Sequence, residues 1–251
     1  MISVICWKWG ALFGPEYVLK LRSMLARHLH AAHRLTCVTD DVAGLDGVST
    51  VALPHELSEA PRCLRRLRQY DPRWLDDNEL WGERVVSIDL DVVIVDDVTS
   101  LFTRPEPIAL WYVRHSSLFC TSIVMYAPDA LRGLWGDFIA DPAGYAAASM
   151  ADVYPARRLR YSPQPDAKRA WFDASDQPIV NHYVRTHRDE LDIGVWSEEE
   201  HGVIPYFGAG YRRGYAPIDA LPAGARIVAL GSSDKHVMDA GGHRWIKEHW
   251  H

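Results

Sequence analysis

The sequence lacks the features that mark secreted, membrane and disulfide-rich proteins. Its first residues contain no basic segment followed by a sustained apolar stretch and a small-residue cleavage site. No apolar run approaches the roughly 18 residues that a membrane-spanning helix requires. None of its four cysteines belongs to a C-x-x-C pair, which argues against a disulfide framework and a structural zinc site. We therefore expect a cytosolic protein without a membrane span.

Three common active-site motifs are also missing. No G-x-G-x-x-G follows the first apolar segment, and neither G-x-x-x-x-G-K-[ST] nor G-x-S-x-G occurs anywhere. These absences argue against a dinucleotide-dependent oxidoreductase, a P-loop enzyme and a serine hydrolase. A cationic excess is missing too, since 27 Lys and Arg face 33 Asp and Glu for a net charge of −6. Contact with nucleic acid would therefore require a local basic patch.

What the sequence does contain is enough apolar material for a large core. Hydrophobic residues make up 48% of the 251 positions and charged residues 24%, which is typical of a folded protein. Apolar periodicity alternates between strands and helices, as in an α/β fold that we expect to be one domain. The pattern predicts strands at 2–7, 34–39, 48–53, 85–88, 92–95, 107–113, 120–126 and 226–230, and helices at 15–29, 62–70, 128–139, 176–185 and 244–250.

The acidic triplet Asp89-Leu90-Asp91 stands between two apolar segments, V-V-S-I and V-V-I-V. Residues i and i+2 of an extended chain point to the same side, so both carboxylates can address one hard divalent cation. Ionised carboxylates at the end of a buried strand need a cation or several hydrogen-bond donors to offset their desolvation. The residues alone leave two interpretations open: a metal site, or a turn or cap at the end of a strand.

The segment 85–102, V-V-S-I-D-L-D-V-V-I-V-D-D-V-T-S-L-F, resembles the D-x-D segment of metal-dependent nucleotide-sugar glycosyltransferases of the GT-A fold. The enzymes it is most similar to are those of family 8, which are glycogenin-like and galactosyltransferase-like, and small bacterial or phage relatives. Further stretches follow in the family's order: I-S-V-I-C-W-K-W-G resembles the first nucleotide-binding strand and loop, and L-T-C-V-T-D-D the end of the second strand. The resemblance implies a Rossmann-like mixed β-sheet flanked by helices.

The resemblance also implies roles for individual residues. Asp89 and Asp91 correspond to the metal-binding and donor-binding carboxylates, and Lys8 lies in the first nucleotide-binding loop. Arg66 occupies the place of a cation that faces the diphosphate. The pair 176–177, Asp-Gln, matches a later motif whose acid lies beside the reacting sugar and the acceptor.

One departure from the family pattern concerns the third metal ligand. The family's C-terminal histidine that completes the metal shell is replaced here by Leu230. Either His236 or Asp234 reaches the metal from a shifted loop, or nucleotide phosphates and water complete the shell. Lys235 remains a candidate phosphate contact.

The expected activity is transfer of a sugar from a nucleoside-diphosphate sugar, a UDP-sugar in the first instance, with Mn²⁺ or Mg²⁺ as cofactor. The resemblance implies a nucleotide-sugar half at about 1–126, an acceptor half at about 127–251, and retention of the anomeric configuration. Five basic residues in 154–171, interleaved with aromatics, suggest an anionic acceptor, either a glycan or a hydroxylated nucleic-acid base of the phage type. The alternative is a non-catalytic protein on the same fold that binds nucleotide sugars or nucleic acid. The oligomeric state stays open.

Structural interpretations compete with several of these assignments. The arginines of 62–68, Arg66 included, fit the solvated face of a helix. Asp176 follows Ser175, which could cap a helix, and an acid in a first helical turn is favourable without any catalytic role. The loop at 154–171 could equally be an ordinary solvated surface loop.

Overall fold

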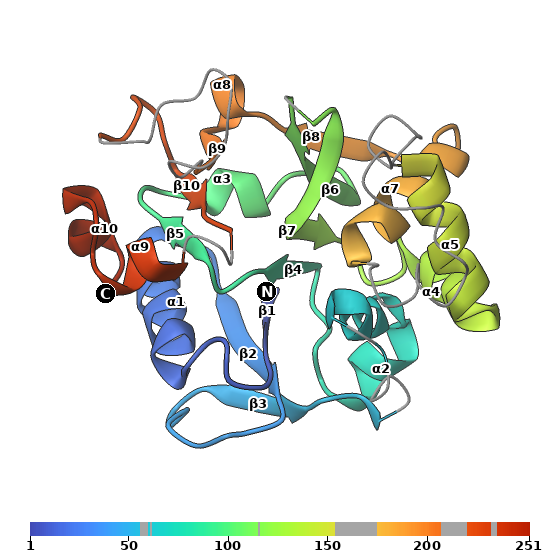
Figure 1. Cartoon of the computed structure of the whole chain (residues 1–251), viewed down its shortest axis with the longest axis horizontal. Coiled ribbons are helices and arrows are strands. Elements are labelled where there is room, and N and C mark those ends of the chain that lie inside the picture. The colour runs from blue at the N-terminus through green and yellow to red at the C-terminus, as the bar shows by residue number, and fades with distance from the viewer. Residues whose placement is uncertain (56–59, 61, 115, 154–174, 207–219, 232–234) are drawn as a thin grey trace.

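The computed structural model describes residues 1–55, 60, 62–114, 116–153, 175–206, 220–231 and 235–251. Within this part of the chain the main element is a seven-stranded mixed sheet with the order β3-β2-β1-β4-β7-β6-β8 (Figure 1). The neighbours from β3 to β4 are parallel, β7 is antiparallel to both β4 and β6, and β8 is parallel to β6. The strands are β1 (Ile2–Lys8), β2 (His33–Thr39), β3 (Ser49–Ala52), β4 (Arg84–Ile88), β6 (Ile108–Val113), β7 (Leu118–Tyr126) and β8 (Ile193–Trp196).

The strand order reverses between β1 and β4. From β1 the chain moves outward through β2 to β3, and it then returns to place β4 on the other side of β1. Loops that leave the carboxyl ends of two such strands diverge to opposite sides, and they leave a crevice at the edge of the sheet. This switch point is where an open α/β sheet is expected to bind a ligand.

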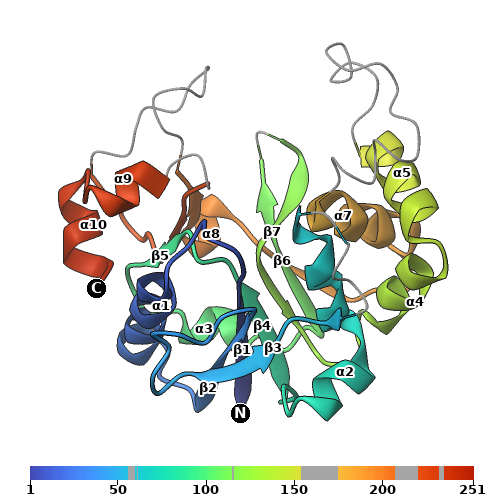
Figure 2. The same ribbon diagram turned by 60° about the horizontal axis from the view of Figure 1, so that its bottom comes forward.

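Helices cover both faces of the main sheet, because its strands are apolar on both sides. Along β1, Val4 and Cys6 belong to one core cluster, whereas Ile5 and Trp7 belong to the other. Figure 2 shows α1, α9 and α10 on one side of the sheet and α2, α4, α5 and α7 on the other. The helices are α1 (Pro15–His28), the 3₁₀ helix η2 (Arg62–Tyr70), α2 (Pro72–Asp77), α3 (Thr99–Phe102), α4 (Arg132–Ala140), α5 (Pro142–Val153), α7 (Asp176–Thr186), α8 (Glu198–His201), α9 (Lys235–Asp239) and α10 (Arg244–His249).

A second, three-stranded sheet has the order β5-β10-β9 and consists of β5 (Val92–Ile94), β9 (Val203–Pro205) and β10 (Ile227–Ala229). The triplet 89–91 is therefore the segment in which the chain leaves the main sheet and enters the small one. Both ends of the triplet are fixed, since Asp89 N donates to the Ser122 carbonyl at 2.8 Å and Leu230 N donates to the Asp91 carbonyl at 2.8 Å.

The structure confirms every predicted strand, and it corrects the helices in three places. The segment 62–70 is a 3₁₀ helix and not an α-helix. The helix expected at 128–139 begins at Arg132. Ser175 stands at the N-cap of α7, but its side chain makes no capping hydrogen bond. No described helix is long and apolar enough to cross a membrane.

Candidate functional site

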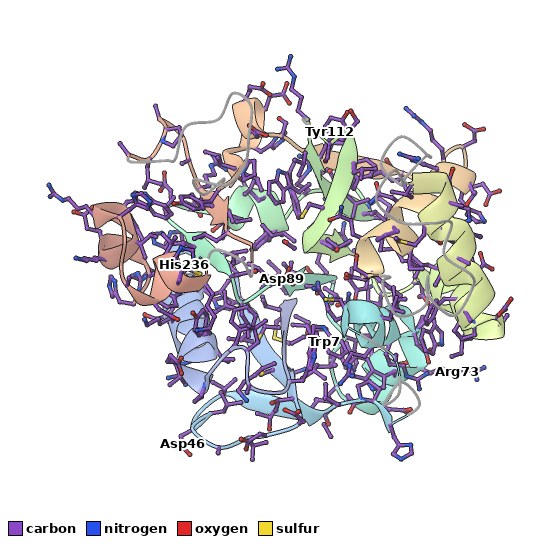
Figure 3. All side chains as sticks on the ribbon, in the orientation of Figure 1. Trp7, Asp46, Arg73, Asp89, Tyr112 and His236 are labelled. Carbon is purple, nitrogen blue, oxygen red and sulfur yellow. The ribbon has the colours of Figure 1, made fainter. Side chains whose placement is uncertain are left out.

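A cavity of about 250 Å³ opens at the switch point, beside the carboxyl ends of β1 and β4. The loop after β1 supplies aromatic and apolar walls, η2 supplies a thiol and a guanidinium, and the acidic triplet supplies two carboxylates. The lining residues are Trp7, Trp9, Leu12, Phe13, Cys63, Arg66, Asp89, Leu90 and Asp91. Figure 3 places Trp7 and Asp89 near the centre of the molecule, where these elements converge.

Arg66 connects the cavity to the first residue of α7. Its Nη1 donates to Asp89 Oδ1 at 2.5 Å, and its Nε lies 3.5 Å from Asp176 Oδ2. The side chain is buried, with only 4% of the residue exposed. The sequence-based interpretation of Arg66 as part of a solvated helix face is therefore wrong. The inward-facing side chains of η2 include Leu64 and Leu67, which pack in the core, and Arg66, which reaches the two carboxylates.

An irregularity in β7 completes the contacts of Arg66. The register of β6 with β7 jumps between Leu110, which pairs with Val124, and Trp111, which pairs with Cys120. The bulged residues of β7 are released from their ladder with β6. Within them, the carbonyl of Thr121 accepts a hydrogen bond from Arg66 Nη2 at 3.0 Å. The bulge therefore gives the buried guanidinium a second hydrogen-bond acceptor beside Asp89.

Asp176 is more deeply buried than any other carboxylate at this site, at 2% exposed. Burial raises the pKa of its carboxyl above the usual range, and the nearby Asp89 carboxylate adds to the rise, whereas the Arg66 guanidinium opposes it. Burial alone would lower the pKa of Arg66, but the facing Asp176 and Asp89 raise it instead. Asp176 Oδ2 has no hydrogen-bond partner among the described residues. Asp176 is not among the described lining residues of the cavity, and Arg66 is the residue that connects it to them.

The oxygen atoms of Asp89 and Asp91 suit a hard divalent cation. Both residues line the same cavity, and Asp91 is only 8% exposed. Mg²⁺ is commonly held by one or two carboxylates together with substrate phosphates and water. In the described part of the chain, no group of three His, Cys, Asp or Glu side chains is arranged to hold a metal by itself. The protein residues thus fit a cation that is shared with a diphosphate.

Other predicted site residues lie outside this cavity lining. Lys8 is buried and its Nζ donates to the Asp41 carbonyl at 3.4 Å, on the opposite side of β1 from Trp7. Gln177 is half-buried in the first turn of α7, next to Asp176. The roles of Lys8 and Gln177 stay predictions.

The C-terminal candidates start helix α9. Lys235 forms an ion pair with Asp239 at 2.5 Å, and His236 is exposed (Figure 3). Neither side chain belongs to the described lining of the cavity. Asp234 and the basic segment 154–171 fall outside the described residues. The assignments of Lys235 and His236 to the site stay predictions as well.

The cavity also contains residues that sequence reasoning did not assign. Trp9 is half-buried, lies against the Arg65 guanidinium with 5.4 Å between ring centroid and Cζ, and presents an aromatic wall together with Phe13. The high tryptophan content suggests that one or two tryptophans stack on a base or sugar, but it does not identify which. Cys63 lies against the same wall, and burial raises the pKa of its thiol to about 12.

No family model matches the sequence, and no curated protein matches it. Solved structures do match. An active-site mutant of LgtC is 10% identical with a TM-score of 0.52, and the match covers 92% of this chain and 87% of that one. The galactosyltransferase LgtC in complex with donor and acceptor sugar analogs is 11% identical with a TM-score of 0.51 and the same coverage.

The chain has a GT-A fold. The resemblance to the family 8 enzymes is thereby confirmed at the level of architecture across most of the chain. In this fold the cavity lies beside the carboxyl ends of β1 and β4, and the segment 89–91 forms part of its wall.

Proposed function

We propose that the chain is a metal-dependent glycosyltransferase, built as a single GT-A domain with a nucleotide-sugar half at about 1–126 and an acceptor half at about 127–251. The observation that carries this proposal is the arrangement around Arg66. Two acidic residues of the D-x-D segment line the cavity at the switch point, and Arg66 joins the first of them to the buried Asp176. The site thus combines oxygen ligands, a fixed cation and a separate buried carboxyl.

The donor in this proposal is a nucleoside-diphosphate sugar, with a UDP-sugar as the first candidate. Asp89 and Asp91 would hold Mn²⁺ or Mg²⁺ against its diphosphate, and Trp9 or Phe13 would pack on an aromatic base or a sugar face. When bound, the cation supplies positive charge that stabilises the leaving diphosphate. Lys8, Lys235 and His236 are further candidates for contacts to the nucleotide, the phosphates and the metal.

The residues of the chain itself account for the remaining requirements of transfer. The bond from the anomeric carbon to a diphosphate oxygen breaks, and a bond to the acceptor oxygen forms as the acceptor hydroxyl passes its proton to the leaving diphosphate or to a carboxylate base. The Arg66 guanidinium is held beside Asp89, so its positive charge would stabilise the negative charge that develops on the leaving diphosphate. Asp176 and Gln177 lie next to each other at the start of α7. There Asp176 would orient the acceptor hydroxyl, stabilise positive charge at the anomeric carbon, or act as the base that takes the acceptor proton.

Retention of the anomeric configuration is part of the proposal because the resemblance to family 8 implies it. The acceptor is a glycan or a hydroxylated nucleic-acid base. Both are bearers of hydroxyl groups, and both can carry the negative charge that a basic segment would attract.

Donor binding with and without metal tests the proposal. The melting temperature is measured for a panel of UDP-, GDP- and TDP-sugars, each with and without Mn²⁺. A ligand at about 100 times its Kd stabilises the native state by about 2.7 kcal/mol. We expect one donor class to raise the melting temperature only with Mn²⁺, and we expect Asp91→Asn to abolish that rise. Asp91 is the better variant because Asp89 also pairs with Arg66.

Asp46→Asn is the matched control, because Asp46 is exposed at the far edge of the molecule (Figure 3). If the donor raises the melting temperature equally without metal, or equally in Asp91→Asn, the metal assignment is wrong. If the donor binds with metal but no sugar reaches any acceptor or water, the alternative of a non-catalytic nucleotide-sugar binding protein replaces the enzyme. If no donor binds, a nucleic-acid binding protein is the remaining candidate.

A further inference from the structure

A second and larger cavity, of about 530 Å³, lies between the C-terminal part of α7 and the strands β6, β7 and β8. Its volume is in the range of small-molecule sites, about 300–1,000 Å³. It shares no lining residue with the cavity at Asp89, and Figure 3 shows Tyr112 well apart from Asp89. Its described lining is Tyr112, Ser117, Phe119, Asn181, Val184, Arg185, Arg188, Leu191, Ile193 and Val195.

The wall formed by the strands is apolar. Tyr112 and Phe119 are paired across β6 and β7, and their rings meet edge to face with centroids 5.8 Å apart. Val195 lies on the edge strand β8 and is 38% exposed, which is unusual for a valine in a strand. Covering these side chains would remove apolar surface from water, so the wall favours an apolar group.

Asn181, the buried polar residue of the described lining, is already hydrogen-bonded within the protein. Asn181 is 2% exposed, and its amide is satisfied within the protein: its Oδ1 accepts from Phe119 N at 2.9 Å, and its Nδ2 donates to the carbonyls of Phe119 and Gln177 at 2.7 and 2.8 Å. A ligand would therefore find its polar partners at the rim and not at the floor.

The rim is cationic. Among the described lining residues, Arg185 and Arg188 are the charged ones, and none is Asp or Glu. Arg185 is already 4.0 Å from Asp152 Oδ2, whereas Arg188 is exposed to solvent. The C-terminus of α7 and the exposed Asp189, Glu190 and Asp192 add negative charge outside the described lining, so attraction of an anion depends on direct contact with the two guanidinium groups. The rim thus favours an anion.

A third, neighbouring cavity determines which end of this cavity an anion would occupy. Tyr112 lines it too, together with Arg114, Ser197, Glu198 and Glu199. Arg114 pairs with Glu199 there at 3.0 Å, and Glu198 adds a second acid. An anionic group is therefore disfavoured on that side, and it is directed toward Arg185 and Arg188.

We propose that this cavity binds an amphipathic organic anion, with the apolar part against Tyr112, Phe119 and Val195 and a phosphate or carboxylate at Arg185 and Arg188. The proposal rests on this cavity alone and does not depend on the chemistry at Asp89. Asp176 and Val184 are eight residues apart on α7, or about 12 Å along its axis. An anion held at the rim would leave the buried site around Arg66 unobstructed.

Calorimetry with n-octyl phosphate as the probe tests this proposal. We expect saturable binding of one molecule per chain, weakened by added salt because the anion is held at an exposed rim. Inorganic phosphate has only the anionic group and n-octanol has only the apolar chain, so each should bind at least tenfold more weakly than octyl phosphate. Arg188→Gln removes a rim cation and Val195→Glu places a carboxylate on the apolar wall, and each should weaken octyl phosphate binding about tenfold or more.

Both substitutions are at exposed positions, so unchanged circular dichroism and melting temperature confirm that the variants are folded. The matched control is Arg73→Gln, since Arg73 is an exposed arginine on α2, far from this cavity (Figure 3). The proposal is overturned if octyl phosphate does not bind, if inorganic phosphate or octanol binds as tightly, or if Arg188→Gln and Val195→Glu bind like the Arg73→Gln control.

Discussion

Replacing Arg66 by methionine should destabilise the protein strongly, although methionine is a good core residue. Methionine fills much of the same volume but leaves Asp89 and Asp176 without their shared cation, and it leaves the Thr121 carbonyl without its donor. Removing one partner of a buried ion pair typically costs about 3–5 kcal/mol, since a charge is left uncompensated. For a chain of this size that corresponds to a fall of about 6–20 °C in melting temperature.

The loss should be pH-dependent, and it should be coupled to Asp176. Without the guanidinium the pKa of the Asp176 carboxyl rises further, so protonation at lower pH relieves part of the penalty. The double variant Arg66→Met/Asp176→Asn removes one of the uncompensated carboxyls. It should be about 1–3 kcal/mol more stable than the sum of the single variants predicts.

Urea unfolding followed by tryptophan fluorescence measures these free energies. Arg73→Met is the control, because Arg73 is exposed on α2 and its replacement should change stability by less than about 0.5 kcal/mol. A loss below about 1 kcal/mol for Arg66→Met, or additive effects of the two substitutions, would show that the guanidinium does not hold the two carboxyls together.

Four further substitutions test the structure elsewhere and at Asp176. The pKa of Asp176 is raised in the folded state, so its protonated carboxyl contributes stability at pH values below its pKa in the unfolded chain. That stability is lost as the pH rises through its pKa in the folded state. Asp176→Asn should therefore gain stability relative to the native chain as pH rises from about 4 to 7, and a flat difference in unfolding free energy would refute the shift. Gly202→Ala should cost more than about 1 kcal/mol, because Gly202 has φ +67° and a Cβ there would lie 2.0 Å from the Gly224 carbonyl oxygen. Gly136→Ala, inside α4 with open space around the position, should instead stabilise by about 0.4–1 kcal/mol in the same urea experiment; the reverse order of these two variants would contradict the backbone described here. Asn181→Ala should cost about 1–3 kcal/mol, since it leaves the Phe119 N–H and two carbonyls without their partner, and a change below about 0.5 kcal/mol would mean that water replaces the amide.

The strands were predictable because their apolar runs are uninterrupted and end at turn residues. The acidic triplet was recognisable for a related reason: two ionisable residues between V-V-S-I and V-V-I-V conflict with an uninterrupted buried strand, and they require either a cation or a turn at the end of the strand. What periodicity could not reveal is that the second apolar run joins a different sheet. The departure of β5 from β4 depends on its pairing with β10, which is more than 130 residues away in sequence.

Local sequence patterns could not predict that Arg66 lies at the centre of the site. Its neighbours Arg65 and Arg68 are also basic, so composition alone indicates a solvated face. The burial of Arg66 follows from the tighter turn of η2 and from the bulge in β7 that releases Thr121, and neither leaves a clear signal in the sequence. Only the resemblance to the family 8 enzymes singled out this arginine, and the structure gives the physical reason in the two carboxylates that it joins.

The most direct test of the account is release of free sugar or transfer to an acceptor from a radiolabelled UDP-sugar, measured with Mn²⁺, with Mg²⁺ and with EDTA. The native chain and the Asp46→Asn control should release label only when a divalent cation is present. Asp91→Asn should lose at least about 99% of that rate, which corresponds to about 2.7 kcal/mol of lost transition-state stabilisation. Equal release in EDTA, or an Asp91→Asn variant as active as the control, would contradict a metal-dependent glycosyltransferase at this site.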